Sequence, residues 1–176
     1  MKKKLYFLFS VIFIILVIGT IIFYSKKDIR SEFLKSLISP KTYEKTSYAD
    51  VDLTQLEQNY KSVFGKYLNE DGLDSLAAVK LPYKYEKLIE INKIDKVKSI
   101  QLNELKCSKE KDYTYSYYEL TYTYESKDKE ICMKDYFVIY LIDENGKDKI
   151  NKVICMPNES SIYKLSIEMN WNMDIW

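Results

Sequence analysis

The most continuous run of apolar residues in this chain lies at its start. From Leu5 to Tyr24 the sequence reads LYFLFSVIFIILVIGTIIFY, without a single charge, and Lys26 and Lys27 follow it. A helix of this length covers about 30 Å, which is the thickness of the hydrocarbon core of a bilayer. The run is apolar on every side and lacks the small-residue cleavage site of a secretory signal peptide. It therefore predicts a retained transmembrane anchor.

Helical periodicity appears after this span. The segment 28–50 carries four apolar residues that share one helical face before Pro40, and we interpret it as a short stalk helix and a linker. The first strong helix, over 52–68, begins at Asp52, an N-cap residue with Gln55 at the third position. The apolar residues of the stalk helix are Phe33, Leu34, Leu37 and Ile38.

Two further helical stretches follow the first. Asn69 is a suitable N-cap for a helix over 69–79, and Pro82 separates this helix from a third stretch that contains Leu88. The acidic run that begins at Asn69 lacks the alternate ligands and the sixth-position glycine of a calcium loop. It therefore indicates a helix cap and no metal site.

From Val97 onward the periodicity changes to that of β-strands. Four segments rich in β-branched and aromatic residues are separated by short polar turns, and they span 97–105, 113–124, 131–142 and 149–156. Alternating apolar residues from Tyr163 to Trp176 predict a fifth strand. In the second strand the aromatic residues change from odd to even positions, which predicts a β-bulge near Tyr117 and Tyr118.

The clearest turn is Asn145-Gly146, because both residues tolerate the positive φ of a two-residue hairpin loop. This turn places Glu144 opposite Lys147 and Tyr136 opposite Cys155. Cys132 then lies about 13 Å out of step with Cys155, too far for a disulfide. The third thiol, Cys107, remains available to pair with either, and the sequence does not fix its register.

These elements predict an α+β fold, in which an N-terminal transmembrane helix precedes helices packed on a curved antiparallel sheet of four to five strands. The expected organisation is a cytoplasmic tail and transmembrane anchor over 1–27, a stalk and linker over 28–50, and an extracytoplasmic α+β domain over 51–176. Residues after the anchor carry 22 basic and 26 acidic side chains, a net charge of −4. The basic tail and the acidic domain favour a single-pass protein of the cell membrane with its C-terminal domain outside.

The composition excludes several classes of function. The acidic balance after the anchor argues against a nucleic-acid partner, which needs a basic face, and Arg30 is the only arginine in the chain. Histidine is absent, which excludes Ser-His-Asp and Cys-His catalysis and any histidine-ligated metal. We therefore expect no catalytic motif, no metal and no cofactor.

The order of elements, including the phrase KYLNEDGLDSLAA, resembles the cone-shaped α+β fold of the nuclear transport factor 2-like superfamily, which is grouped with cystatin-like domains. The resemblance covers residues 50–176. It implies a domain that low-GC Gram-positive bacteria carry outside the membrane behind one span, in some cases within conjugative transfer machinery. Enzymatic members of the superfamily are isomerases and cyclases with acid–base residues in a cavity between helices and sheet.

Two functions follow as hypotheses. The first is a non-catalytic interaction or assembly component of the cell envelope, in transfer or secretion machinery, which binds the bilayer through residues 5–24 and contacts other envelope proteins. The second is a small-ligand or dehydratase/isomerase-type pocket, in which Asp135 would act with Tyr122 or Tyr136 in enolate chemistry. Stacking of the tyrosines on wall carbohydrate is a third possibility. The contact residues that we expect are aromatic, namely Tyr118, Tyr122, Tyr140, Trp171 and Trp176.

Overall fold

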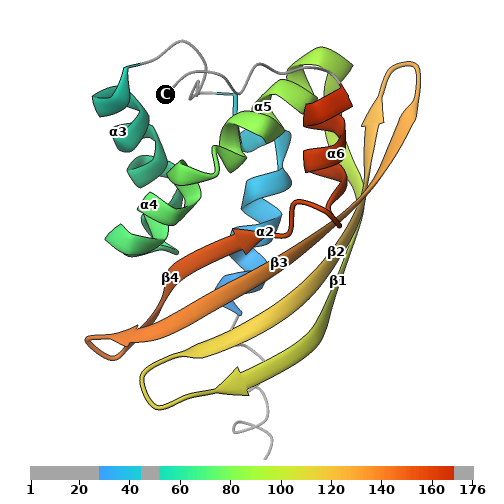
Figure 1. Ribbon diagram of the computed structural model, residues 1–176. Coiled ribbons are helices and arrows are strands. Elements are labelled where there is room, and N and C mark those ends of the chain that lie inside the picture. Colours follow the sequence, from blue (N-terminus) through green and yellow to red (C-terminus); the bar gives the residue numbers. More distant parts are fainter. Residues whose placement is uncertain (1–27, 45–51, 169–176) are drawn as a thin grey trace, which may run out of the picture.

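The computed structural model describes residues 28–44 and 52–168, which form five α-helices and one four-stranded sheet (Figure 1). The strands follow one another in the order β1-β2-β3-β4, each antiparallel to its neighbour, and the helices cover one face of the curved sheet. The elements are α2 (Ile29–Ile38), a 3-10 turn (Pro40–Thr42), α3 (Leu53–Phe64), α4 (Glu70–Ala78), α5 (Leu81–Asn92), β1 (Ile94–Lys109), β2 (Thr114–Ser126), β3 (Glu130–Glu144), β4 (Lys147–Cys155) and α6 (Ser161–Glu168).

The predicted α+β class and the curved antiparallel sheet are confirmed, with four strands in the described part of the chain. None of the helices within residues 28–44 and 52–168 is both long enough and apolar enough to cross a bilayer. The predicted span, Leu5 to Tyr24, and most of the predicted linker lie outside the described residues.

Local capping signals fix the starts of α3 and α4, of which α4 packs on β4 and α3 packs on α4. The side chain of Asp52 accepts a hydrogen bond from the amide of Gln55 at 2.8 Å, and that of Asn69 accepts one from the amide of Gly72 at 3.0 Å. Both predicted helix starts are confirmed. Gly72 allows α4 to approach β4 closely, because a Cβ atom at this position would lie 2.2 Å from the carbonyl oxygen of Ile150.

Helix α2 is part of the hydrophobic core. Its four apolar residues, predicted to share one face, are all fully buried beneath the sheet and the other helices. The ring of Phe33 meets those of Phe64 and Tyr67 edge to face, with centroids 5.8 and 6.2 Å apart. Residues 29–38 are therefore a core helix and not the free-standing stalk that the sequence suggested.

The hairpin between β3 and β4 forms at the predicted turn. Asn145 and Gly146 have φ values of 57° and 79°, and Glu144 pairs with Lys147. Further along, the register shifts by one residue between Tyr140 and Leu141, so that Phe137 lies opposite Cys155. The predicted pairing of Tyr136 with Cys155 is therefore wrong by one position. All three cysteines are free thiols, two of them exposed (Cys107 and Cys132) and Cys155 buried.

The predicted bulge in the second strand is also placed wrongly. Side chains of β2 alternate between the inner and outer faces from Ser116 to Tyr124 without a change of phase. The extra residue opposite Tyr117 and Tyr118 is Leu105 in β1, one of three register irregularities in that strand. The odd-numbered and even-numbered aromatic residues of β2 therefore lie on opposite faces of the sheet.

The predicted fifth strand, Tyr163 to Trp176, is helical over 163–168, which belong to α6 (Ser161–Glu168), and its remaining residues lie outside the described part. Contacts with β3 fix the start of this helix. The carboxylate of Asp135 accepts a hydrogen bond from the amide of Ile162 at 2.9 Å, and the hydroxyl of Ser160 accepts one from the amide of Tyr136 at 2.9 Å. These partners are distant in sequence, which is why alternation alone indicated a strand.

Candidate functional site

The inner face of the sheet contains a buried polar junction around Asp135. The hydroxyls of Tyr122 and Tyr85 donate hydrogen bonds to one oxygen of this carboxylate at 2.5 and 2.8 Å, while its other oxygen accepts from Ile162. Burial raises the pKa of Asp135, and the hydrogen bonds from Tyr122 and from the backbone of Ile162 oppose the rise. Burial also raises the pKa of each of these two tyrosines well above its usual value.

This junction joins α5 and α6 to β2 and β3 in the interior of the described domain. Asp135, Tyr122 and Tyr85 are each 0% exposed. Three hollows on the described surface have volumes of about 780, 440 and 680 Å³, and the residues that line them do not include Asp135 or Tyr122. The structure thus brings Asp135 and Tyr122 together, as the hypothesis of enolate chemistry required. They lie in the packed interior and not in an open pocket. Tyr136, the other partner considered, lies on the opposite face of the sheet.

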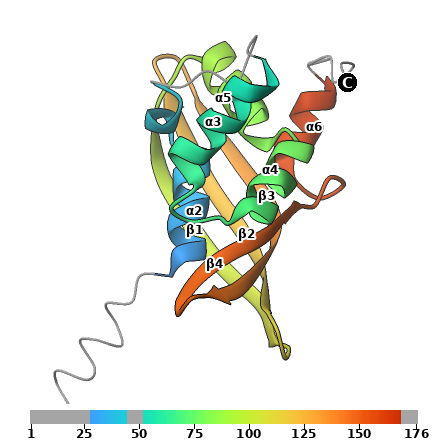
Figure 2. The same cartoon turned by 90° about the vertical axis from the view of Figure 1, so that its left-hand side faces the viewer.

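None of the described helices, α2 to α6, covers the opposite face of the sheet, because they gather on the inner side (Figure 2). Odd-numbered residues of β2 and even-numbered residues of β3 point to this outer face. Five tyrosines lie on it or at its edge, in two groups that differ in their polar partners. They are Tyr113, Tyr115, Tyr117, Tyr136 and Tyr140.

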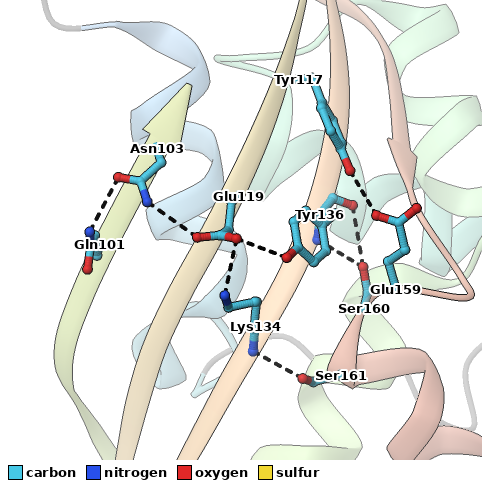
Figure 3. Close-up of polar contacts among 9 residues, drawn as sticks. All are labelled: Gln101, Asn103, Tyr117, Glu119, Lys134, Tyr136, Glu159, Ser160 and Ser161. Carbon is cyan, nitrogen blue, oxygen red and sulfur yellow. Dashed lines mark hydrogen bonds and ion pairs between the residues drawn. The ribbon is translucent and has the colours of Figure 1, made fainter. Parts of the chain in front are cut away.

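We name Tyr117 and Tyr136 the tyrosine pair. Their rings are stacked with centroids 6.0 Å apart and planes 30° apart. The hydroxyl of Tyr136 donates to Glu119 at 2.9 Å, and that of Tyr117 donates to Glu159 at 2.9 Å (Figure 3). Glu119 also accepts from the amine of Lys134 at 3.2 Å. Each hydroxyl of the pair is therefore held in one direction by a carboxylate.

The same contacts set the protonation states of the pair. The hydrogen bond from Tyr136, with a further one from Lys134, lowers the pKa of Glu119, and that bond also raises the pKa of Tyr136. Loss of hydration, together with the hydrogen bond to Glu159, raises the pKa of Tyr117 to about 12. Both phenols remain protonated at neutral pH and donate to a carboxylate, so this part of the outer face presents two neutral hydroxyls in fixed orientations beside Glu119 and Glu159.

We name Tyr113, Tyr115 and Tyr140 the tyrosine triad. Their ring centroids are 5.6 to 6.4 Å apart, at the end of the sheet where β1 turns into β2. The amine of Lys106 lies 5.9 Å from the ring centroid of Tyr115, and that of Lys152 lies 6.0 Å from that of Tyr140. In the described part of the chain, the three hydroxyls of the triad make no hydrogen bond.

The aromatic residues proposed from the sequence do not form one site. Tyr118 and Tyr122 are buried on the inner face, 2% and 0% exposed, whereas Tyr140 belongs to the triad on the outer face. Trp171 and Trp176 lie outside the described residues. The tyrosine pair was not predicted from the sequence, because the change of aromatic phase in β2 was interpreted as a bulge. The sequence signal for the pair is the presence of tyrosines at both odd and even positions, which in a regular strand places aromatic rings on both faces of the sheet.

No protein family, characterised protein or solved structure matches this chain. The resemblance to the nuclear transport factor 2-like superfamily therefore stays a prediction based on the order of helices and strands.

Proposed function

We propose that this protein is a single-pass, membrane-anchored interaction domain of the cell envelope, which binds another envelope protein through the outer face of its sheet. The observation that supports this most strongly is the outer face, which no described helix covers and on which Glu119 and Glu159 each accept a hydrogen bond from one hydroxyl of the tyrosine pair. A pocket function receives less support, because the carboxylate between helices and sheet is fully enclosed by side chains.

The tyrosine pair suits a protein partner for physical reasons. Tyrosine supplies a large amphipathic contact area and is enriched among the residues that dominate binding energy at interfaces. Here the rings are already ordered, so that binding costs little side-chain entropy. Val138 and Ile154 form the next cross-strand position beside Tyr117 and are partly exposed. Carboxylates at both hydroxyls favour a partner that presents a basic side chain among apolar ones.

The anchor and its orientation are the second part of the proposal. The uncharged run from Leu5 to Tyr24 has the length and the composition of a transmembrane helix. Lysines precede it, and an acidic domain of net charge −4 follows it, which favours the domain on the extracytoplasmic side. Residues 1–27 would then hold the described domain at the outer surface of the membrane.

Photo-crosslinking in the native cells tests the proposal. A benzoylphenylalanine placed at Val138, on the outer face, is expected to give a discrete crosslinked product whose second protein mass spectrometry identifies. The matched control carries the same group at Gln58, an exposed position on α3 on the helical side. Recovery of monomer alone from Val138, with the protein present in the membrane fraction, would contradict the proposed interaction face.

A further inference from the structure

The chain leaves the predicted anchor and is fixed to the sheet almost at once, through the only arginine of the sequence. The guanidinium of Arg30 contacts the carboxylate of Asp28 at 2.9 Å, the hydroxyl of Ser116 at 2.5 Å and the carboxylate of Glu104 at 3.5 Å. The hydroxyl of Tyr118 donates to Asp28 at 3.3 Å and to Glu104 at 3.1 Å. Residue 28 is thereby attached to the β1–β2 half of the sheet.

This attachment limits how far the sheet can lie from the bilayer. Four residue steps separate Tyr24, the last residue of the predicted span, from Asp28, and they extend over about 14 Å at most. Five residue steps separate Tyr118, which contacts Asp28, from Tyr113, which directly precedes β2, and they cover about 17 Å. The hairpin between β1 and β2 therefore extends from this contact over about the length that the linker can span.

The hairpin and the start of α2 lie at the same end of the molecule in both views (Figures 1 and 2). That end carries the tyrosine triad and the two lysines above its rings, Lys106 and Lys152. Four more charged residues, Lys109, Glu110, Lys111 and Asp112, are exposed at the turn itself, so that the turn adds no net charge to Lys106 and Lys152.

We infer that the triad end of the sheet rests on the bilayer, with Tyr113, Tyr115 and Tyr140 in the headgroup layer and the neighbouring lysines against anionic lipid phosphates. This inference rests on the proposed function, since it requires residues 5–24 to span the membrane. Tyrosine rings prefer the headgroup layer, where the ring meets hydrocarbon and the hydroxyl meets water and phosphate. The triad hydroxyls have no partner in the described part of the chain, and lysines near a membrane surface are attracted to its anionic lipids.

The two groups of outer tyrosines would then have different roles. The triad would fix the tilt of the domain on the membrane, while the tyrosine pair, further along β2 and β3, would face sideways above the lipid. A partner in the same membrane could then reach the pair without displacing the triad. This division explains why the pair has its hydroxyls bound by carboxylates and the triad does not.

Two native thiols provide the test. Cys107 pairs with Ser116 near the triad end, and Cys132 pairs with Thr123 toward the other end, about 24 Å away along β2. The full chain is reconstituted in nanodiscs of phosphatidylcholine and phosphatidylglycerol with a nitroxide on the lipid headgroup. A small fluorophore is attached to Cys107 in the Cys132→Ser variant and to Cys132 in the Cys107→Ser variant.

We expect the nitroxide to quench the fluorophore on Cys107 and to leave that on Cys132 unchanged. Replacing all three triad tyrosines with serine should reduce the quenching at Cys107. Serine at both positions of the tyrosine pair is the matched control and should leave it unchanged.

Nanodisc-bound protein with no quenching at Cys107, or with quenching that the triad variant does not reduce, would overturn the inference and leave the anchor intact. Protein that fails to enter the nanodiscs would instead overturn the anchor, and with it the proposed function.

Discussion

Replacing Asp135 with alanine tests the interpretation of the buried junction as the contact that fixes α6 and α5 to the sheet. The substitution removes the acceptor of two phenolic hydroxyls, those of Tyr85 and Tyr122, and of the amide of Ile162. All three donors are enclosed, so water cannot replace the lost acceptor without opening the core. A buried donor left without a partner costs about 1–3 kcal/mol, and the substitution leaves three such donors.

Because the substitution also removes the cost of burying the carboxylate itself, we expect Asp135→Ala to lower the free energy of unfolding by about 3–5 kcal/mol, near the lower end of the sum for three donors and a large part of the total of about 5–15 kcal/mol of a typical domain. The assay is guanidinium chloride unfolding of the full chain in detergent micelles, followed by the near-ultraviolet circular dichroism of the tyrosines. Asp74→Ala, at an exposed position on α4, is the matched control and should change the value by less than about 0.5 kcal/mol. A loss below about 1 kcal/mol in Asp135→Ala would refute the structural role of the carboxylate.

The raised pKa of Asp135 also predicts how the stability of the fold depends on pH. Because burial raises the pKa of Asp135, the folded protein keeps this proton to a higher pH than the unfolded chain, in which the pKa is about 3.9. The stability that Asp135 contributes is thus fully present below about pH 4 and declines as the pH rises through the folded pKa. Asparagine does not titrate, so the stability advantage of the wild-type protein over Asp135→Asn should shrink across this window. An advantage that grows with pH would contradict the assignment.

Three further outcomes follow from the structure. Burial lowers the pKa of Lys84 to about 8, so between about pH 8 and pH 10 the folded protein has lost this proton while the unfolded chain still binds it, and stability rises with pH. Urea titrations should therefore show a stability difference between wild type and Lys84→Met that grows in favour of the wild type over this range. Gly72→Ala should destabilise the fold by about 1–3 kcal/mol, because the new Cβ would clash with the carbonyl oxygen of Ile150. Thermal unfolding measures this loss, and an unchanged melting temperature would contradict the close packing of α4 on β4. Cys155 is buried and its pKa is raised to about 12, so a thiol reagent should titrate two cysteines in the folded protein and all three after unfolding.

Local signals in the sequence predicted those elements whose geometry depends on neighbouring residues. The caps at Asp52 and Asn69 each need one side-chain oxygen and an amide three residues later, and both helices begin where these residues predicted. The Asn145-Gly146 turn depends only on backbone conformations that these two residue types tolerate.

Elements that depend on distant partners were predicted less well. Helix α6 has alternating apolar residues that suit a strand, and its start is fixed by Asp135 and by backbone amides of β3 that precede it by about two dozen residues. The one-residue shift between β3 and β4 and the extra residue Leu105 in β1 likewise arise from strand pairing, which leaves no mark on local composition.

The candidate site follows the same division. The high tyrosine content of β2 and β3 was evident from the sequence, and it correctly indicated that aromatic residues dominate the sheet. Which tyrosines face outward depends on the phase of the strand relative to the helices, which is a tertiary property. Tyr118 and Tyr122 were therefore proposed as contacts although they are buried, and the tyrosine pair was not proposed.

The most direct test of the central claim is labelling of intact native cells with a membrane-impermeant maleimide, followed by separation of membranes from the soluble fraction. The account predicts that the protein is recovered in the membrane fraction with its exposed thiols, Cys107 and Cys132, already labelled before lysis. Thiols that react only after lysis, or protein found free in the medium without residues 1–27, would contradict a domain held at the outer surface of the membrane.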